Sequence, residues 1–498
     1  MNHPRFFAAV LSLALLLGGC GAPQTVPAQP EETAPAPEAQ PAPEENPAPS
    51  VSEDPLSRPA GSAGTEGNPL IAMVMFSPEW DGQPVEMKSC ATTPGVPCTE
   101  AVLEQQDGVP ALRLDFGQPV QPRMLELSFD GAAVQALEIT DSQGQLRYRQ
   151  EDFLTGGETR ADRSRLVWLG DGETDGLTLR FTLEEGADPT ALRLTTVEVT
   201  GSPDRQEDFA LAAYLPVNAA GDLSAYVETA AQASDLILNT AVYWDAQGSL
   251  QADPALETVL DQLGPAPQGQ RRWVTINPQG ELVRQGAAGQ TLDTPEERQS
   301  LVQAMVDFCR EQGFDGVDID WEFPREEEWA DFSAFLVTLS QTLKPQGMGL
   351  SLALYPEEVP LSPEAVQAVD RVNLMAYDQF DDAGRHSTYS GAQQAISVMT
   401  GMGFAPEQLL LGLPLYGRPL DGSANWPTLA DAALPDAFSN EQNGVFYSNT
   451  ALARDKTALA ARRGLGGVMF YHLLCDTPGE SGQLWQVSEL VRQVRGQA

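Results

Sequence analysis

Residues 314–324, "FDGVDIDWEFP", decide the fold, because an apolar run here also carries several acids. Side chains alternate along a strand, so Val317, Ile319 and Trp321 share one face. The other face carries the acids Asp318, Asp320 and Glu322. A solvated edge strand would also place acids on one face. A salt-bridged interior would need basic partners, of which this chain has few, so a functional role for the acids is favoured.

Apolar strand patterns alternate with helical patterns on both sides of this stretch, which is typical of a parallel sheet wrapped by helices. One such helix is predicted at 294–313, with Thr294 as N-cap, Glu297 in capping-box position and Gly313 as its stop. The strand segments are 209–216, 235–244, 271–278, 316–323, 349–356, 371–378, 408–417 and 466–474. Eight strands predict a (β/α)8 TIM barrel over residues 205–498, with the acids near its C-terminal mouth, where active sites lie.

Residues 69–204 show short alternating segments instead. In "LTLRFTL", for example, Leu177, Leu179 and Phe181 fall on one face. This pattern predicts an all-β, sandwich-like accessory domain, for which carbohydrate binding and simple spacing remain equal alternatives. Cys90 and Cys98 enclose a turn-rich segment and would form a small disulfide if the protein is exported.

The N-terminus predicts export. Residues 1–20 have the form of a secretory signal peptide, and their ending "LGGC" resembles the lipobox of bacterial lipoproteins, which implies lipidation at Cys20. Residues 21–68 are rich in Pro, Ala and Glu, which predicts a disordered linker. We therefore expect a lipid-anchored protein on the bacterial cell surface.

The composition excludes some classes of partner. Asp and Glu outnumber Lys and Arg by 70 to 29, giving a net charge of -41, so no nucleic-acid partner is expected. The three histidines lack the spacing of a metal site, and we expect no metal, no cofactor and a monomer.

Three carboxyls this close together cannot all ionise cheaply, so at least one should keep its proton near neutral pH. A protonated carboxyl is what protonation of a glycosidic oxygen requires. The stretch resembles the DxxDxDxE signature of family 18 glycoside hydrolases, chitinases and endo-β-N-acetylglucosaminidases, with Asp315 as its first acid. The later segments "LMAYD", "GLPLYGR" and "GGVMFYHLLCD" are similar to further motifs of that family.

The resemblance implies hydrolysis of β-1,4 bonds next to N-acetylglucosamine, with retention and with the substrate's acetamido group as nucleophile. It implies that Glu322 is the general acid and base, that Asp320 orients the acetamido group, and that Asp318 shares a proton with Asp320. Tyr377 would donate to the acetamido oxygen, and Asp315 would be structural. The resemblance also implies sugar-binding side chains, namely Asp378, Met375, Tyr416, Arg418, Tyr471 and Tyr214.

The chain departs from the family pattern in two places. The third strand has Thr275 and Asn277 where the family has SxGG, although Thr275 keeps a hydroxyl for Asp318. The eighth strand has Tyr471 where the family has a Trp, which is a larger aromatic face. The alternatives are a non-catalytic lectin-like surface lipoprotein, against which Glu322 argues, and an adhesin acting through the sandwich domain.

Overall fold

The computed structural model describes residues 73–76, 80–91, 100–151, 153, 163–322 and 324–497. All of them fall within one compact unit, Thr65–Ala498. No helix in these ranges is long and apolar enough to cross a membrane. The signal peptide, Cys20, the linker and Cys98 lie outside the described residues, so lipidation and the disulfide stay predictions.

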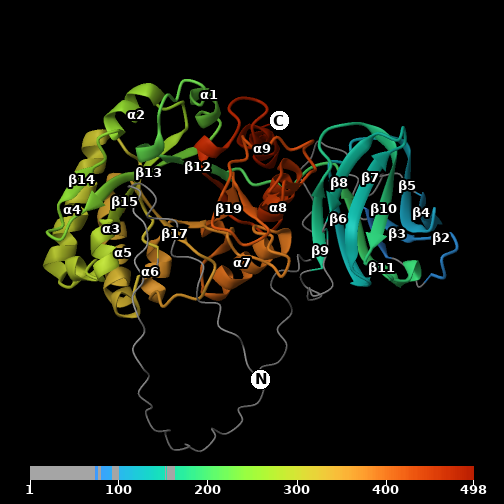
Figure 1. Ribbon diagram of the computed structural model, residues 1–498, viewed down its shortest axis with the longest axis horizontal. Helices are drawn as coiled ribbons and strands as arrows, with labels where there is room; N and C mark the ends of the chain where they lie inside the picture. Colours follow the sequence, from blue (N-terminus) through green and yellow to red (C-terminus); the bar gives the residue numbers. More distant parts are fainter. Residues whose placement is uncertain are drawn as a thin grey trace, which may run out of the picture. The chain divides into compact units, whose positions relative to one another are not determined.

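Two antiparallel sheets form the first part of the described chain, as the sequence predicts (Figure 1, blue to teal). One sheet has the order β3-β1-β11-β6-β9 and the other β2-β4-β5-β10-β7-β8. Inward side chains of both sheets share one core, and Leu177, Leu179 and Phe181 are all buried in it. The strands are β1 Met73–Phe76, β2 Val85–Glu86, β3 Lys88–Ala91, β4 Glu100–Gln106, β5 Val109–Val120, β6 Met124–Gly131, β7 Val134–Asp141, β8 Leu146–Glu151, β9 Ser164–Trp168, β10 Thr174–Leu183 and β11 Leu192–Thr200.

The second part is a closed barrel of eight parallel strands (Figure 1, green to red). Its order is β12-β23-β19-β18-β17-β16-β15-β13, and a β12–β13 pairing closes the ring. A short antiparallel strand, β14 Leu250–Ala252, adds to β13. The barrel strands are β12 Ala210–Pro216, β13 Asp235–Trp244, β15 Arg271–Pro278, β16 Gly316–Ile319, β17 Gly349–Leu354, β18 Arg371–Leu374, β19 Leu409–Pro414 and β23 Gly467–Tyr471.

Helices surround the barrel, and their apolar faces pack on the outward side chains of the strands. The predicted capping box is confirmed: Thr294 and Glu297 bond each other's backbone N–H groups, and the helix ends at Gly313 in the left-handed region. The helices are α1 Val227–Ala230, α2 Leu256–Leu263, α3 Gly280–Gln285, α4 Pro295–Gln312, α5 Trp329–Leu343, α6 Pro363–Ala368, α7 Tyr389–Gly401, α8 Thr450–Arg462 and α9 Gln483–Val494. A small sheet, β20 Gly417–Pro419, β21 Glu441–Gln442 and β22 Val445–Tyr447, precedes α8.

Several strands end earlier than the sequence predicts. The segment 316–323 was expected to be extended throughout, but β16 ends at Ile319. Its ladders to β15 and β17 stop at Asp318 and Ile319, although these neighbours continue to Pro278 and Leu354. The chain leaves the sheet here, and the backbone N–H of Asp320 bonds the side chain of Asn277 instead of a strand. Asp320 and Glu322 therefore lie on the loop at the barrel mouth rather than on the strand.

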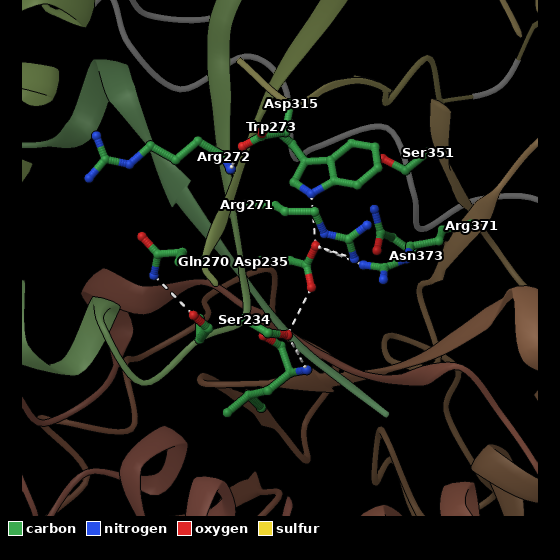
Figure 2. A network of polar contacts seen from close by, with 12 residues as sticks. Ser234, Asp235, Gln270, Arg271, Arg272, Trp273, Asp315, Ser351, Arg371 and Asn373 are labelled. Atoms are coloured by element: carbon green, nitrogen blue, oxygen red, sulfur yellow. Dashed lines mark hydrogen bonds and ion pairs between the residues drawn. The ribbon is translucent and has the colours of Figure 1, made fainter. Parts of the chain in front are cut away.

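A buried ion-pair network closes the opposite end of the barrel (Figure 2). Asp235, the first residue of β13, is 1% exposed. Its carboxylate lies 2.9 Å from Arg271 and 2.8 Å from Arg371, and it accepts hydrogen bonds from Trp273 Nε1 and Ser234 Oγ. Burial opposes ionisation, but the two arginines prevail and hold the pKa of Asp235 below its usual value.

We expect Asp235→Asn to lower the free energy of unfolding by about 2 kcal/mol at pH 7, because it removes charged hydrogen bonds to two guanidinium groups that water reaches only in part. A group with a lowered folded pKa contributes stability above its unfolded pKa and loses it as the pH falls through the folded value. The difference between variant and wild type should therefore shrink between pH 5 and pH 3. Urea unfolding at several pH values measures it. The exposed Asp208→Asn is the matched control and should change little at either pH.

Candidate active site

Asp318 is the most buried acid of the site, with no exposed surface. Ser351 Oγ and Asn373 Nδ2 donate to its Oδ1 at 2.6 and 3.0 Å. Thr275 Oγ1 and Tyr214 OH donate to its Oδ2 at 2.9 and 3.1 Å. These donors come from four other barrel strands, β17, β18, β15 and β12. One carboxylate thus ties five strands together and is fixed in orientation.

Burial raises the pKa of Asp318, while its four hydrogen bonds work in the opposite direction. Thr275 supplies the hydroxyl that the sequence predicts for it. Among the hydrogen bonds of the described residues, none joins Asp318 directly to Asp320. The shared proton expected from the sequence has no direct hydrogen bond in this structure, and Asp318 acts on Asp320 through its charge.

Asp320 lies two residues after Asp318 and closer to the C-terminal mouth of the barrel. Its backbone N–H donates to Asn277 Oδ1 at 2.8 Å, so the residue that replaces a family glycine helps to hold the catalytic loop. Its side-chain Oδ1 is buried and has no hydrogen-bond partner among the described residues. Burial, and then the charges of Glu322 and Asp318, raise the pKa of Asp320 well above its usual value. A buried acceptor without a donor is costly unless a ligand supplies one.

Glu322 lies beyond Asp320 on the same loop. Burial raises its pKa, and the nearby charge of Asp378 adds to the rise. Because Asp320 and Glu322 repel each other's ionisation, the pair should retain a proton at higher pH than either carboxyl would alone. The shifts of both pKa values therefore favour the protonated form that a general acid needs.

Aromatic side chains line the barrel interior beside these acids. Tyr377 stacks on Tyr471 with ring centroids 5.9 Å apart, and Tyr214 lies 5.7 Å from Tyr471. Tyr416 meets Tyr377 edge to face at 6.1 Å, and Met375 packs against the same cluster. The predicted sugar-binding residues are thus brought to one place, next to Glu322 and Asp320.

Asp378 completes the cluster, in the left-handed region at φ 62°. Tyr416 OH donates to its Oδ2 at 2.8 Å, and Arg418 Nε and His386 Nδ1 each lie 3.4 Å from its Oδ1. Burial opposes ionisation, but these partners hold the pKa of Asp378 below its usual value. Asp378 is therefore a fixed negative charge beside Glu322.

Comparison with known proteins agrees with this arrangement. Residues 287–476 match the family described as "Glycosyl hydrolases family 18". Residues 287–476, which hold the barrel strands β16 to β23, are therefore a family 18 glycosyl hydrolase domain. The matched range begins after β15, the strand in which Thr275 and Asn277 depart from the family pattern.

Relatives of the family 18 domain include mouse Chitotriosidase-1, 27% identical over 251 residues, which are 37% of this chain and 54% of that protein. Chitinase A1 of Niallia circulans is 26% identical over 312 residues, 45% of this chain and 41% of the relative. The chain thus spans about half the length of the curated relatives it matches. The crystal structure of the GH18 chitinase ChiB of Flavobacterium johnsoniae shares the fold, with TM-score 0.52, 22% identity and coverage of 57% of this chain and 94% of that one.

Several residues of the family 18 domain that contact the site were not predicted from the sequence. Ser351 is the lone polar residue in an otherwise apolar strand, and Asn373 lies between two apolar residues of its strand, which is a usable signal; Figure 2 labels both. His386, on the loop after β18, gave no such signal. Phe380 and Trp426 are 45% and 36% exposed, and Trp426 meets Tyr416 edge to face at 5.6 Å.

Asp315 lies apart from the site, as an exposed residue just before β16. Its Oδ2 accepts a hydrogen bond from the backbone N–H of Arg272 at 2.7 Å (Figure 2). This contact joins β15 to β16 at the end of the barrel opposite the mouth. Within the described ranges, no group of three His, Cys, Asp or Glu side chains is arranged to hold a metal ion.

Proposed function

We propose that this protein hydrolyses β-1,4 bonds next to N-acetylglucosamine by retaining, substrate-assisted catalysis. The observation that carries the proposal is the unpartnered, buried Oδ1 of Asp320 beside Glu322, whose pKa burial raises. An acetamido N–H is a donor of the right chemistry for that oxygen. Plain glucose at the same position would leave it unsatisfied.

In the first step, Glu322 donates its proton to the glycosidic oxygen, and the leaving sugar departs with that bond's electron pair. The acetamido carbonyl oxygen of the substrate attacks the anomeric carbon and forms an oxazolinium-type ring. With the proton of the coupled pair placed on Glu322, Asp320 is the ionised member; it accepts the acetamido N–H and stabilises the positive charge that develops there. Tyr377, whose hydroxyl keeps its proton because burial raises its pKa, donates to the acetamido oxygen before attack.

In the second step, Glu322 is a carboxylate and takes a proton from water, which attacks the anomeric carbon from the face that the leaving group vacated. The ring opens, the acetamido group is regenerated, and the product keeps the β configuration. Two inversions at one carbon give net retention. Asp318 and its four donors keep the strand beneath Asp320 in place throughout.

The proposal favours accessible glycans over crystalline polymers. Between Arg418 and Gly464 the described chain holds only the small β20–β22 sheet, its loops and α8, so no large insertion walls the groove. We infer an open cleft from this, and an open cleft would support endo action on chitin-type oligosaccharides, the N-glycan core or peptidoglycan. A surface location, lipidation at Cys20 and the monomeric state stay predictions from the sequence.

We expect the protein to cleave N-acetylated chito-oligosaccharides and to release the β-anomer first, whereas glucosamine oligomers of equal length should be cut at least about 100-fold more slowly. The second substrate is a matched control, since it lacks only the acetyl groups. Mass spectrometry gives the products, and early-time NMR gives the anomer. Equal rates on both substrates, or initial release of the α-anomer, would contradict the mechanism. Binding of acetylated oligomers without any cleavage would favour the lectin-like alternative.

A further inference from the structure

His386 lies behind Asp378 on the loop that follows β18, and it is 0% exposed. Its Nδ1 is 3.4 Å from Asp378 Oδ1. The imidazole ring lies against Tyr416 at 5.5 Å and stacks on Phe380 at 6.3 Å. Packed in this way, the ring has little freedom to turn, so its Nδ1 stays near the carboxylate. Nδ1 and Asp378 Oδ1 are both buried, and neither has a hydrogen bond of good geometry among the described residues, so each is a polar partner available to the other.

The residue after His386 is held by a buried lysine. Lys456 of α8 is 0% exposed, and its Nζ donates to the carbonyl and the hydroxyl of Ser387 and, at 3.1 Å, to Ser448 Oγ. All three ammonium donors are thus used. Ser387, at φ 50°, donates in turn to the carbonyl of Ala376 at 3.1 Å. The lysine therefore joins α8 to the backbone on both sides of Tyr377 and Asp378.

The neighbouring residue on α8 binds the β-sandwich. Asp455 is 2% exposed, and its carboxylate accepts hydrogen bonds from Tyr148 OH at 2.6 Å and from the backbone N–H of Trp168 at 2.7 Å. Tyr389, the first residue of α7, accepts one from the backbone N–H of Leu166 at 3.0 Å. Strands β8 and β9 thus contact both helices that adjoin the His386 loop.

We propose that His386 is a positioning residue for Asp378, held in place by Lys456, and that the β-sandwich belongs to the catalytic unit because it fixes α8 through Asp455. The proposal rests on the proposed function, since it assigns Asp378 to the working site. It gives the β-sandwich a role that neither carbohydrate binding nor spacing supplies.

The charges around His386 agree with a neutral imidazole whose Nδ1–H points at Asp378. The charged groups that face it are Asp378, Arg418 and Lys456. Tyr416, also in contact, stays protonated because burial raises its pKa. Burial lowers the pKa of His386, Asp378 opposes that change, and the two cations reinforce it. A neutral donor leaves the full negative charge of Asp378 beside Glu322.

The first test compares two variants at the same position. His386→Leu removes the donor and should lower kcat about tenfold with a smaller change in KM, because Asp378 is no longer oriented. His386→Asn keeps an N–H donor near the position of Nδ1 and should restore most of the loss. Equal rates in both variants would overturn the positioning role, since a purely structural histidine would not be rescued by a smaller polar residue.

The second test asks whether the β-sandwich acts through α8. Tyr148→Phe removes one hydrogen bond to Asp455 and should lower kcat about threefold, and Lys456→Met should lower it as much as His386→Leu. Arg454→Met is the matched control, because Arg454 on the same helix donates to the backbone carbonyl of Gln486 and pairs with Glu489, both on α9, rather than bonding the β-sandwich. It should lower Tm and leave kcat unchanged. Equal effects of Tyr148→Phe and Arg454→Met on kcat would overturn the role of the β-sandwich.

The third measurement does not depend on activity. The chain has three histidines, so 15N NMR of the full-length protein can assign the imidazole of His386 by its loss in His386→Asn. We expect a neutral Nδ1–H tautomer at pH 7, and a higher pKa for His386 in Lys456→Met, where a nearby positive charge is gone. An Nε2–H tautomer would overturn the inference. If this spectrum is as expected but no acetamido oligosaccharide is cleaved, the proposed function fails and the positioning contact stands.

Discussion

Replacing Glu322 with glutamine is expected to lower kcat by about 10³-fold while leaving oligosaccharide binding nearly unchanged. The glutamine keeps the shape of the side chain but cannot donate a proton to the glycosidic oxygen, and general acid catalysis of this kind contributes about 10²–10⁴-fold. In the proposed mechanism, binding relies on the aromatic cluster and on Asp378, none of which the substitution changes. Steady-state kinetics give the rate, and isothermal titration calorimetry gives the dissociation constant.

The thermal stability of Glu322→Gln distinguishes a loss of catalysis from a folding defect. Burial raises the pKa of Glu322 above its unfolded value. The ionised carboxylate therefore costs stability, a cost that is absent below the unfolded pKa and grows as the pH rises. Glu322→Gln should consequently show a Tm at pH 8 equal to or above that of the wild type. Glu327→Gln, an exposed acid nearby, is the matched control and should keep full activity. A wild-type rate in Glu322→Gln would refute the mechanism.

The barrel and the sandwich could be predicted from the sequence because both follow from local patterns. Alternation in "LTLRFTL" places Leu177, Leu179 and Phe181 inward, and Thr294 and Gly313 mark the two ends of α4. These signals act over a few residues. They failed at the mouth, where β16 ends at Ile319 while β15 and β17 continue, because the alternation of side chains does not mark the point at which a strand leaves its sheet.

The environment of each acid could be predicted only in part. Asp318 is bonded by Tyr214, Thr275, Ser351 and Asn373, which lie 104, 43, 33 and 55 residues away in the chain. Periodicity indicates which side chains face the barrel interior but not which of them meet. Only Thr275 was predicted to support Asp318, by its place in a resembling motif. His386 lies on a loop, where side chains follow no regular periodicity. Its contact with Asp378 could therefore be seen only in the folded structure.

Asp320→Asn is expected to lower kcat about 10²-fold and to shift the pH dependence of activity toward acid. The rate falls because the amide lacks the negative charge that stabilises the developing oxazolinium ring, and removal of one such preorganised group costs about 10²–10³-fold. The pH effect has a separate cause. Asp320 and Glu322 each make the other harder to ionise, so neutralising Asp320 lowers the pKa of Glu322.

The direction of the shift follows from the role of Glu322. In the proposed mechanism, activity requires protonated Glu322. The alkaline limb of the kcat/KM profile therefore reports the pKa of Glu322. This limb should move to lower pH in Asp320→Asn. Asp315→Asn is the matched control: it makes the same change in the same motif, at an exposed position whose carboxylate bonds the backbone of Arg272. Its alkaline limb should coincide with that of the wild type.

An unmoved limb in Asp320→Asn, together with a hundredfold loss in kcat, would mean that Asp320 acts on the substrate alone. A limb displaced toward alkaline pH would show that Glu322 is not the acid that the profile reports.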